Sequence, residues 1–320
     1  MDEATTQEEE LLLGQRSLNA EQLSAELCKL ARVRLVSVFE CSLSSLPENK
    51  QTQEVEVLIA TSNLLSDVTL LVRGWKRLKR LYLASNQLVL LPQDFHLLEH
   101  LQRLDVSRNR LTAVGRLPAA LERLDVHANE ISELPELPES LTRLACHSNR
   151  PLRSLGPLAS LQHLTHLNVS FCPLLVSLPK LPASLESLRA DACGLKGELN
   201  VLGLRALRRL EAKRNHLTSV QLRDCSELLT LILSDNDLLR APEGVAALPL
   251  VSVDLEANHQ LPKEFRRKKK KKTFVIHCFF LLVSLLRPRL SMLSFLGKKQ
   301  WNCEKDWRKN NGNYLNFNRK

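Results

Sequence analysis

The sequence predicts an α/β solenoid, in which short repeats stack around one parallel β-sheet. The first observation behind this prediction is a nine-residue pattern that occurs twice, as LQRLDVSRN over residues 101–109 and as LERLDVHAN over residues 121–129. The second observation is that similar segments recur along the chain at intervals of 20 to 23 residues. One such unit cannot bury its own apolar face, so neighbouring units must stack.

The spacing of apolar residues within the pattern predicts a short strand. Leu101, Leu104 and Val106 hold the first, fourth and sixth positions, and side chains two residues apart on a strand share one face. We therefore expect the fourth and sixth positions in the core, and the second, third, fifth, seventh and eighth positions facing solvent. Aromatic residues make up only 4% of the chain, so this core consists mainly of Leu and Val.

Eleven repeats follow the pattern, and their ninth position carries only Asn or Cys. The repeats begin at Val33, Val55, Leu78, Leu101, Leu121, Leu141, Leu164, Leu185, Leu207, Leu228 and Leu250. The ninth residues are Cys41, Asn63, Asn86, Asn109, Asn129, Asn149, Cys172, Cys193, Asn215, Asn236 and Asn258. An amide side chain both donates and accepts hydrogen bonds, so we expect a structural ladder that satisfies buried backbone groups where each repeat leaves its strand.

Three regions are expected along the chain. Residues 1–32 are an acidic segment followed by a capping helix over residues 19–31, with Asn19 as its N-cap. Residues 33–262 hold the eleven repeats, and residues 263–320 form a basic and apolar tail. Apolar pairs followed by Pro come after several ninth positions and mark turns away from the strand. The convex side is therefore expected to hold loops, 3₁₀ turns and short helices.

The units over about residues 33–262 resemble leucine-rich repeats. The segment Leu88–Asn109 is similar to the cytosolic type found in Ras-pathway scaffold proteins, and the 20-residue units that begin at Leu117 and Leu137 are similar to the short LPX-type repeats of bacterial effector proteins. In that effector family a large ubiquitin-ligase domain follows the repeats, but only 58 residues follow here, so this activity is not carried over. The resemblance implies a horseshoe whose concave parallel sheet binds other proteins.

The charge is unevenly distributed along the chain. The formal net charge is +10, but Lys263–Lys320 holds 17 Lys and Arg against 3 Asp and Glu, a balance of +14, which leaves −4 for residues 1–262. The basic balance thus belongs to the tail, and the repeats are mildly acidic. We therefore expect no specific nucleic-acid binding.

The eight Cys residues include no C-x-x-C pair. Cys41, Cys172 and Cys193 hold ninth positions and Cys146 holds a sixth, so we expect small buried residues with weak S–H donors, and no disulfide or zinc framework. Residues 1–10 show no basic segment ahead of an apolar run, so no secretory signal is expected. These observations together predict an intracellular, cytoplasmic protein.

The concave face is the predicted partner-binding surface, because the pattern determines which side chains point outward. The candidate residues are Arg80, Tyr82, Arg103, Asp105, Arg123, Asp125, His127, Arg143, His147, His166, Phe171, Arg189, Arg209, Glu211 and Ile232. Adjacent strands lie about 4.8 Å apart, so equivalent residues form columns. The Arg column can bind acidic or phosphorylated groups through bidentate contacts. The alternative is that Arg103 pairs with Asp105 and Arg123 with Asp125, in exposed ion pairs worth about 0–1 kcal/mol.

The other outward side chains also have ordinary alternatives. Tyr82, Phe171 and Ile232 are either anchors for a partner or scattered apolar side chains of the usual kind. His127 and His147 hold the seventh position of neighbouring repeats, but no carboxylate or thiolate completes a tetrahedral set, so no metal site is expected. No phosphate-binding loop, nucleophile elbow or pair of catalytic carboxylates is present, so we expect no enzyme activity, no cofactor and no small-molecule substrate.

Two functional hypotheses follow, and they differ in the role of the tail. The preferred one is a non-enzymatic scaffold in intracellular signalling that binds a protein partner on its concave face. The alternative is a peripheral or tail-anchored membrane adaptor, in which residues 266–296 contact an anionic membrane surface. The apolar segment Phe274–Leu286 has 13 residues, fewer than the roughly 20 that span a membrane. The tail is otherwise interpreted as a cap on the last repeat, a disordered segment or translated non-coding sequence.

Overall fold

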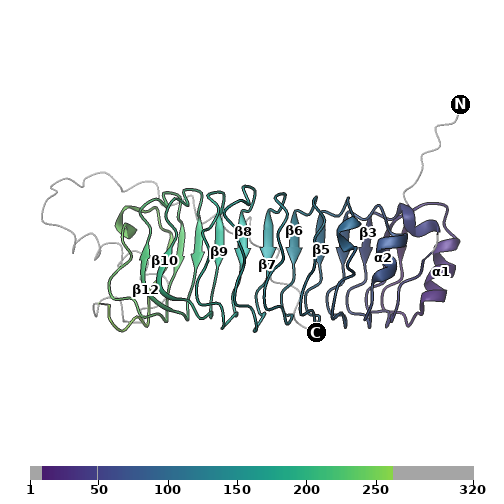
Figure 1. The fold of residues 1–320 in the computed structure, drawn as a ribbon, viewed down its shortest axis with the longest axis horizontal. Coiled ribbons are helices and arrows are strands. Elements are labelled where there is room, and N and C mark those ends of the chain that lie inside the picture. The colour runs from purple at the N-terminus through teal and green to yellow at the C-terminus, as the bar shows by residue number, and fades with distance from the viewer. Residues whose placement is uncertain (1–8, 49, 262–320) are drawn as a thin grey trace, which may run out of the picture. The chain divides into compact units, whose positions relative to one another are not determined.

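The repeats align their strands into one long parallel sheet, as the computed structural model shows (Figure 1). The structure describes residues 9–48 and 50–261, and all of these lie within Met1–Phe279, one of the two compact units of the chain. Twelve strands form the main sheet, and each pairs in parallel with the next. The predicted α/β solenoid is confirmed. The tail at residues 263–320, with its membrane and capping interpretations, lies outside the described residues.

The main sheet holds β1 (Glu9–Leu12), β2 (Val33–Ser37), β3 (Val57–Ile59), β4 (Arg80–Tyr82), β5 (Arg103–Asp105), β6 (Arg123–Asp125), β7 (Arg143–Ala145), β8 (His166–Asn168), β9 (Ser187–Arg189), β11 (Arg209–Glu211), β13 (Thr230–Ile232) and β14 (Ser252–Asp254). A second, two-stranded parallel sheet holds β10 (Lys196–Asn200) and β12 (His216–Gln221). The helices are α1 (Ala20–Cys28) and α2 (Thr69–Gly74), with the 3₁₀ turns η1 (Lys50–Glu54), η2 (Phe95–Leu97) and η3 (Val245–Ala247).

Equivalent residues of successive repeats lie in register across the main sheet. Leu104 pairs with Leu81 on one side and with Leu124 on the other. Leu101 and Val106 are fully buried, and Leu104 is 2% exposed. The first, fourth and sixth positions therefore line one continuous core, which is what the apolar spacing predicts.

Several seventh-position residues differ from the prediction that this position faces solvent. Ser107 is only 2% exposed and Ser170 only 5%. The Ser107 hydroxyl donates a hydrogen bond to Asp105 Oδ1 at 2.6 Å, and the Asp191 N–H donates to Ser170 Oγ at 3.1 Å. A short polar side chain at this position can thus stay buried without an unsatisfied group.

The eighth position has a left-handed backbone in every repeat, with φ between 51° and 59°. These residues are Glu40, Ser62, Ser85, Arg108, Ala128, Ser148, Phe171, Ala192, Arg214, Asp235 and Ala257. None is Gly, so the sequence carries no indication of this conformation, which costs an L-residue about 1–2 kcal/mol. The turn directs the chain off the strand and brings the ninth side chain into the interior, where its hydrogen bonds offset the strain.

Asn129 shows how the ninth position joins two repeats. Its Oδ1 accepts a hydrogen bond from the Leu111 N–H at 2.9 Å, and its Nδ2 donates to the carbonyls of Val106 at 3.0 Å and Val126 at 3.1 Å. Leu111 and Val106 belong to the preceding repeat. The same arrangement occurs at Asn63, Asn86, Asn109, Asn149, Asn215, Asn236 and Asn258. We call the eleven ninth-position residues the Asn/Cys ladder.

At Cys172, cysteine replaces Asn where the preceding repeat lacks the usual donor. Cys172 Sγ donates to the carbonyls of Cys146 at 3.6 Å and Ser170 at 3.7 Å, but a thiol supplies no equivalent of the amide oxygen. In the Asn repeats that oxygen accepts from the residue two positions after the preceding ninth residue. The corresponding residue here, two positions after Asn149, is Pro151, which has no N–H. The missing acceptor therefore coincides with a missing donor.

The N-terminal end of the solenoid differs in detail from the prediction. The helix expected over residues 19–31 is the shorter α1, which begins after Asn19, and a capping box joins Asn19 to Gln22 at 2.8 and 2.9 Å. No strand is expected before residue 33, yet β1 pairs in parallel with β2. This segment forms a strand because its side chains alternate between the two faces, with Leu11 buried and Leu12 61% exposed.

The side opposite the main sheet is mostly loop, as predicted, apart from the parallel β10–β12 pair. These two strands bury Leu199, Leu217 and Val220, and they lie on segments that follow ninth positions. No helix within residues 9–48 and 50–261 is long and apolar enough to cross a membrane.

We predict that Asn129→Ala lowers the free energy of unfolding by about 2–4 kcal/mol, because it leaves the Leu111 N–H and two carbonyls buried without their partner. Cys172→Ala removes only long S–H contacts and should cost about 1 kcal/mol. Urea unfolding of both variants measures the difference. Equal losses would contradict the role that we assign to the amide.

We also predict opposite effects of Gly at two alanines of adjacent repeats. Ala128→Gly relieves a left-handed residue with φ 53° and should leave stability unchanged or raise it by up to about 1 kcal/mol. Ala145→Gly, in the extended strand β7, should lower stability by about 0.5–1 kcal/mol. Thermal unfolding compares the pair, and a larger loss at Ala128 would be inconsistent with strain at the eighth position.

Candidate functional site

The sheet face, made by the outward third and fifth positions of the main-sheet strands, carries a column of like charges. Arg80, Arg103, Arg123 and Arg143 lie in register on β4, β5, β6 and β7. His166 follows them on β8. We call the four arginines the arginine column. Like charges directly opposite one another destabilise a sheet, so this arrangement is an electrostatic cost to the fold.

The neighbouring aspartates do not neutralise the column. Asp105 accepts from the Ser107 N–H at 3.0 Å and hydroxyl at 2.6 Å. Asp125 accepts from the His127 N–H at 3.1 Å and lies 2.6 Å from His127 Nδ1. Among the ion pairs of the described residues, none involves an arginine of the column. The structure contradicts the alternative of Arg–Asp pairs within one strand, because neither aspartate forms an ion pair with an arginine of the column and Oδ1 of each bonds to the seventh-position residue instead.

The C-terminal half of the sheet face is compensated by its own carboxylates. Glu211 lies 3.3 Å from Arg189 and 2.9 Å from Arg209. Beside the sheet face, at the seventh position of two neighbouring repeats, Asp191 lies 3.9 Å from Lys213 Nζ and accepts the Lys213 N–H at 3.0 Å. The same third-position column is thus unpaired on β4–β7 and paired on β11.

Two buried side-chain nitrogens have no hydrogen-bond partner among the described residues, and both lie in this region. They are Arg123 Nε and His147 Nδ1. An unsatisfied buried donor or acceptor costs about 1–3 kcal/mol. Such exceptions are rare in folded proteins, and each calls for an explanation.

His127 and His147 stack on one another, with ring centroids 4.3 Å apart and an interplanar angle of 7°. Burial lowers the pKa of His147, and the neighbouring His127 lowers it further. Burial also lowers the pKa of His166, with Arg143 as the next cause. The His147 ring in this stack is therefore neutral near pH 7. The part of the chain that the structure describes contains no group of three or more His, Cys, Asp or Glu residues able to hold a metal ion.

The candidate apolar anchors lie in two different settings. Tyr82 and Ile232 are half-buried fifth-position residues of β4 and β13. Phe171 is 51% exposed, but it follows the end of β8 and holds a left-handed eighth position with φ 59°. The sequence pattern grouped Phe171 with outward residues of the strands, and this is wrong, because β8 ends at Asn168 and the chain has already turned at Phe171.

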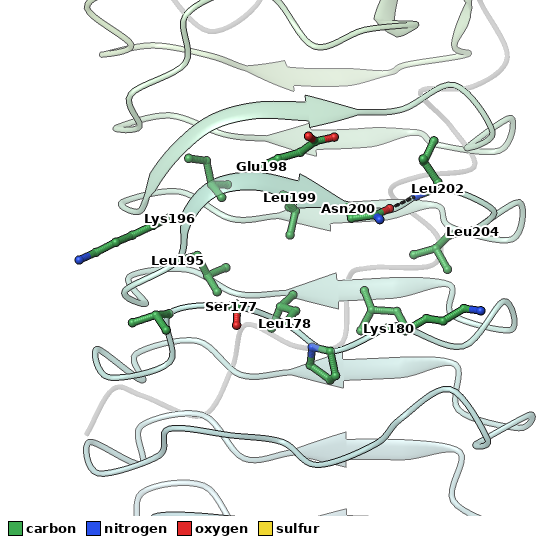
Figure 2. Close-up of a pocket in the computed structure, with 14 residues that line it drawn as sticks. Ser177, Leu178, Lys180, Leu195, Lys196, Glu198, Leu199, Asn200, Leu202 and Leu204 are labelled. Carbon is green, nitrogen blue, oxygen red and sulfur yellow. Dashed lines mark hydrogen bonds between the residues drawn. The ribbon is translucent and has the colours of Figure 1, made fainter.

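A cavity of about 420 Å³ lies between residues 176–181 and β10 (Figure 2). Leu178, Leu195 and Leu199 line it, while Lys196 extends away from the other lining residues. The 14 lining residues include no His or Cys. Sequence reasoning missed this cavity, because loop packing beside an unpredicted strand creates it.

The buried thiols act as hydrogen-bond donors. Cys41 Sγ donates to the Leu13 carbonyl at 2.9 Å, and Cys193 Sγ donates to the Val169 carbonyl at 3.1 Å. Burial raises the pKa of Cys193 to about 12. A thiol with this pKa is protonated at neutral pH and is a poor nucleophile and metal ligand.

No family model matches this chain, and a search of curated proteins finds no match. Solved structures do match. YopM, a leucine-rich effector protein from Yersinia pestis, is 28% identical with a TM-score of 0.59, covering 75% of this chain and 64% of that one. An LRR protein from Leptospira interrogans is 23% identical with a TM-score of 0.57, covering 77% and 72%. The match to an octameric complex of Latrophilin 3, Unc5D and FLRT2 (LRR) is 21% identical with a TM-score of 0.64, covering 82% and 89%. All three are leucine-rich repeat structures, and none identifies the Ras-scaffold type.

We predict that His147 makes the fold less stable in mild acid. The unfolded chain binds a proton at a His pKa of about 6.5, whereas the folded His147 has a lowered pKa and stays neutral. Stability therefore falls as the pH drops below about 6.5. Urea unfolding at pH 7.5 and pH 5.5 should show a smaller loss for His147→Gln than for the native chain. An equal loss in both would count against this linkage.

Proposed function

We propose that this chain, a leucine-rich repeat protein, is a non-enzymatic scaffold that binds a protein partner on its sheet face. The observation that carries the proposal is the arginine column, which lies outward in register and has no ion-pair partner among the described residues. A fold tolerates such a row of like charges at a cost. A partner protein with negatively charged groups can bind this row of arginines and offset the repulsion between them.

The shape of the sheet face supports the same proposal. Twelve parallel strands place their outward side chains in continuous columns, so a partner meets an extended surface. The leucine-rich repeat protein FLRT2 occurs in a complex with Latrophilin 3 and Unc5D. By analogy, we propose that this solenoid also assembles with other proteins.

The chemistry of the described residues favours binding over catalysis. Asp125 and His127 form a pair of the kind that orients a catalytic base. Within residues 9–48 and 50–261, however, no hydrogen bond joins the ring of His127 or His147 to a Ser, Thr or Cys side chain. Half of the 14 residues that line the cavity in Figure 2 are leucines, and the lining contains no His and so no such pair.

We further propose a cytoplasmic location and a role in signalling. Six cysteines are free in the described part of the chain, and five of them are buried. Free thiols of this kind fit a reducing compartment. The membrane-adaptor alternative concerns residues 266–296, which lie outside the described residues, and we propose no membrane role.

Photo-crosslinking from two sites of one repeat tests the proposal. A benzoylphenylalanine in place of Tyr82 lies on the sheet face, and one in place of Leu97, which is 55% exposed on η2, lies outside the sheet. We expect a protein conjugate in cells from position 82 and none from position 97. A conjugate from position 97 alone, equal yields from both positions, or no conjugate from either would overturn the proposal.

A further inference from the structure

We propose that the arginine column binds a short acidic segment of the partner protein, through carboxylate side chains that meet successive guanidinium groups. This inference rests on the proposed function and names the chemistry of the partner. It also assigns the contact to β4–β7, out of the twelve strands of the sheet.

Charge pairing within the chain selects this part of the sheet face. Arg209 holds the same third position as the column, but Glu211 lies 2.9 Å from it. Arg189 shares the same carboxylate at 3.3 Å. No ion pair of the described residues joins a carboxylate to Arg103 or Arg123, and Oδ1 of Asp105 and of Asp125 is instead hydrogen-bonded to the seventh-position residue of its own repeat. An incoming carboxylate therefore competes with no internal partner on β4–β7 and would have to displace Glu211 on β11.

The spacing of the column sets the length of the ligand. The register places one arginine on each of four consecutive strands, from Arg80 to Arg143. Strands lie about 4.8 Å apart, so the three intervals span about 14 Å. An extended peptide covers about 3.3 Å per residue, so four or five residues match the column. Each guanidinium can bind a carboxylate through two parallel N–H donors.

The charge of the whole domain favours an acidic peptide over nucleic acid. Residues 1–262 carry 28 Lys and Arg against 32 Asp and Glu, a balance of −4. A long polyanion would meet this overall negative field beyond the column. Asp105 and Asp125 also stand in the next column of the same strands. A ligand of a few residues needs only the local positive row.

Direct binding of a defined probe tests the inference. Fluorescein-labelled hexaglutamate is titrated with the full chain, and fluorescence anisotropy reports binding. The basic run in the tail would bind this probe by itself, so Lys268→Gln to Lys272→Gln are introduced in every protein compared. We expect saturable binding of hexaglutamate and none of hexaglutamine. Binding should weaken as salt rises.

Matched substitutions at one position of the repeat locate the site. Arg123→Gln should weaken hexaglutamate binding about tenfold, as expected when one charge-assisted bidentate contact is lost. Arg103→Gln combined with Arg123→Gln should abolish it. Arg209→Gln, at the same position but paired with Glu211, should change it by less than about twofold. Thermal unfolding controls for damage, because removal of one like charge from the column should leave the Tm unchanged or raise it.

Several outcomes would overturn the inference. One is that hexaglutamine binds as tightly as hexaglutamate. Another is that Arg209→Gln weakens hexaglutamate binding as much as Arg123→Gln does. A third is that an oligothymidylate of equal charge binds more tightly than the peptide. The proposed function is judged separately by the conjugate from position 82. A conjugate there without hexaglutamate binding would leave the scaffold intact and assign its partner a different chemistry.

Discussion

The hydrogen bonding of buried backbone groups at the end of each strand is the constraint on which the rest of this structure depends. Every repeat turns inward there, through a left-handed eighth residue and a ninth residue of the Asn/Cys ladder. Asn129 satisfies one N–H and two carbonyls in two repeats at once. Because each ladder residue depends on its neighbour, the stack is cooperative from repeat to repeat.

The Asn/Cys ladder also determines how side chains are arranged on the sheet face. It holds successive repeats in register, so a residue type that recurs in the sequence becomes a column in space. Four recurring arginines are thus forced into proximity, although like charges oppose it. The buried leucine core and the ladder stabilise the stack against that cost. The arginines on β4–β7 and Arg209 on β11 hold the same position in their repeats. Arg209 is paired because Glu211 lies beside it, whereas Asp105 and Asp125 bond to other residues.

Part of the candidate site could be predicted from the sequence. The period placed the arginines in one column, because a strand has a side-chain period of two and the repeats align. It did not reveal that Asp105 and Asp125 bond to Ser107 and His127, since both interactions depend on the conformation of the turn after the strand. The stacking of His127 on His147 and the cavity beside β10 were likewise absent from the pattern.

The sequence by itself determined the solenoid, the sequence positions of its core residues and the identity of the ladder residues, because local periodicity alone specifies which side chains share a face. Only the tertiary structure decided which charges are paired, that β1 and β10 are strands, and that Phe171 lies beyond β8. The physical reason is that pairing and turn geometry depend on distances between neighbouring repeats. Residues such as Ala128 and Arg108 adopt a left-handed backbone that nothing in their side chains favours, because the surrounding stack imposes it.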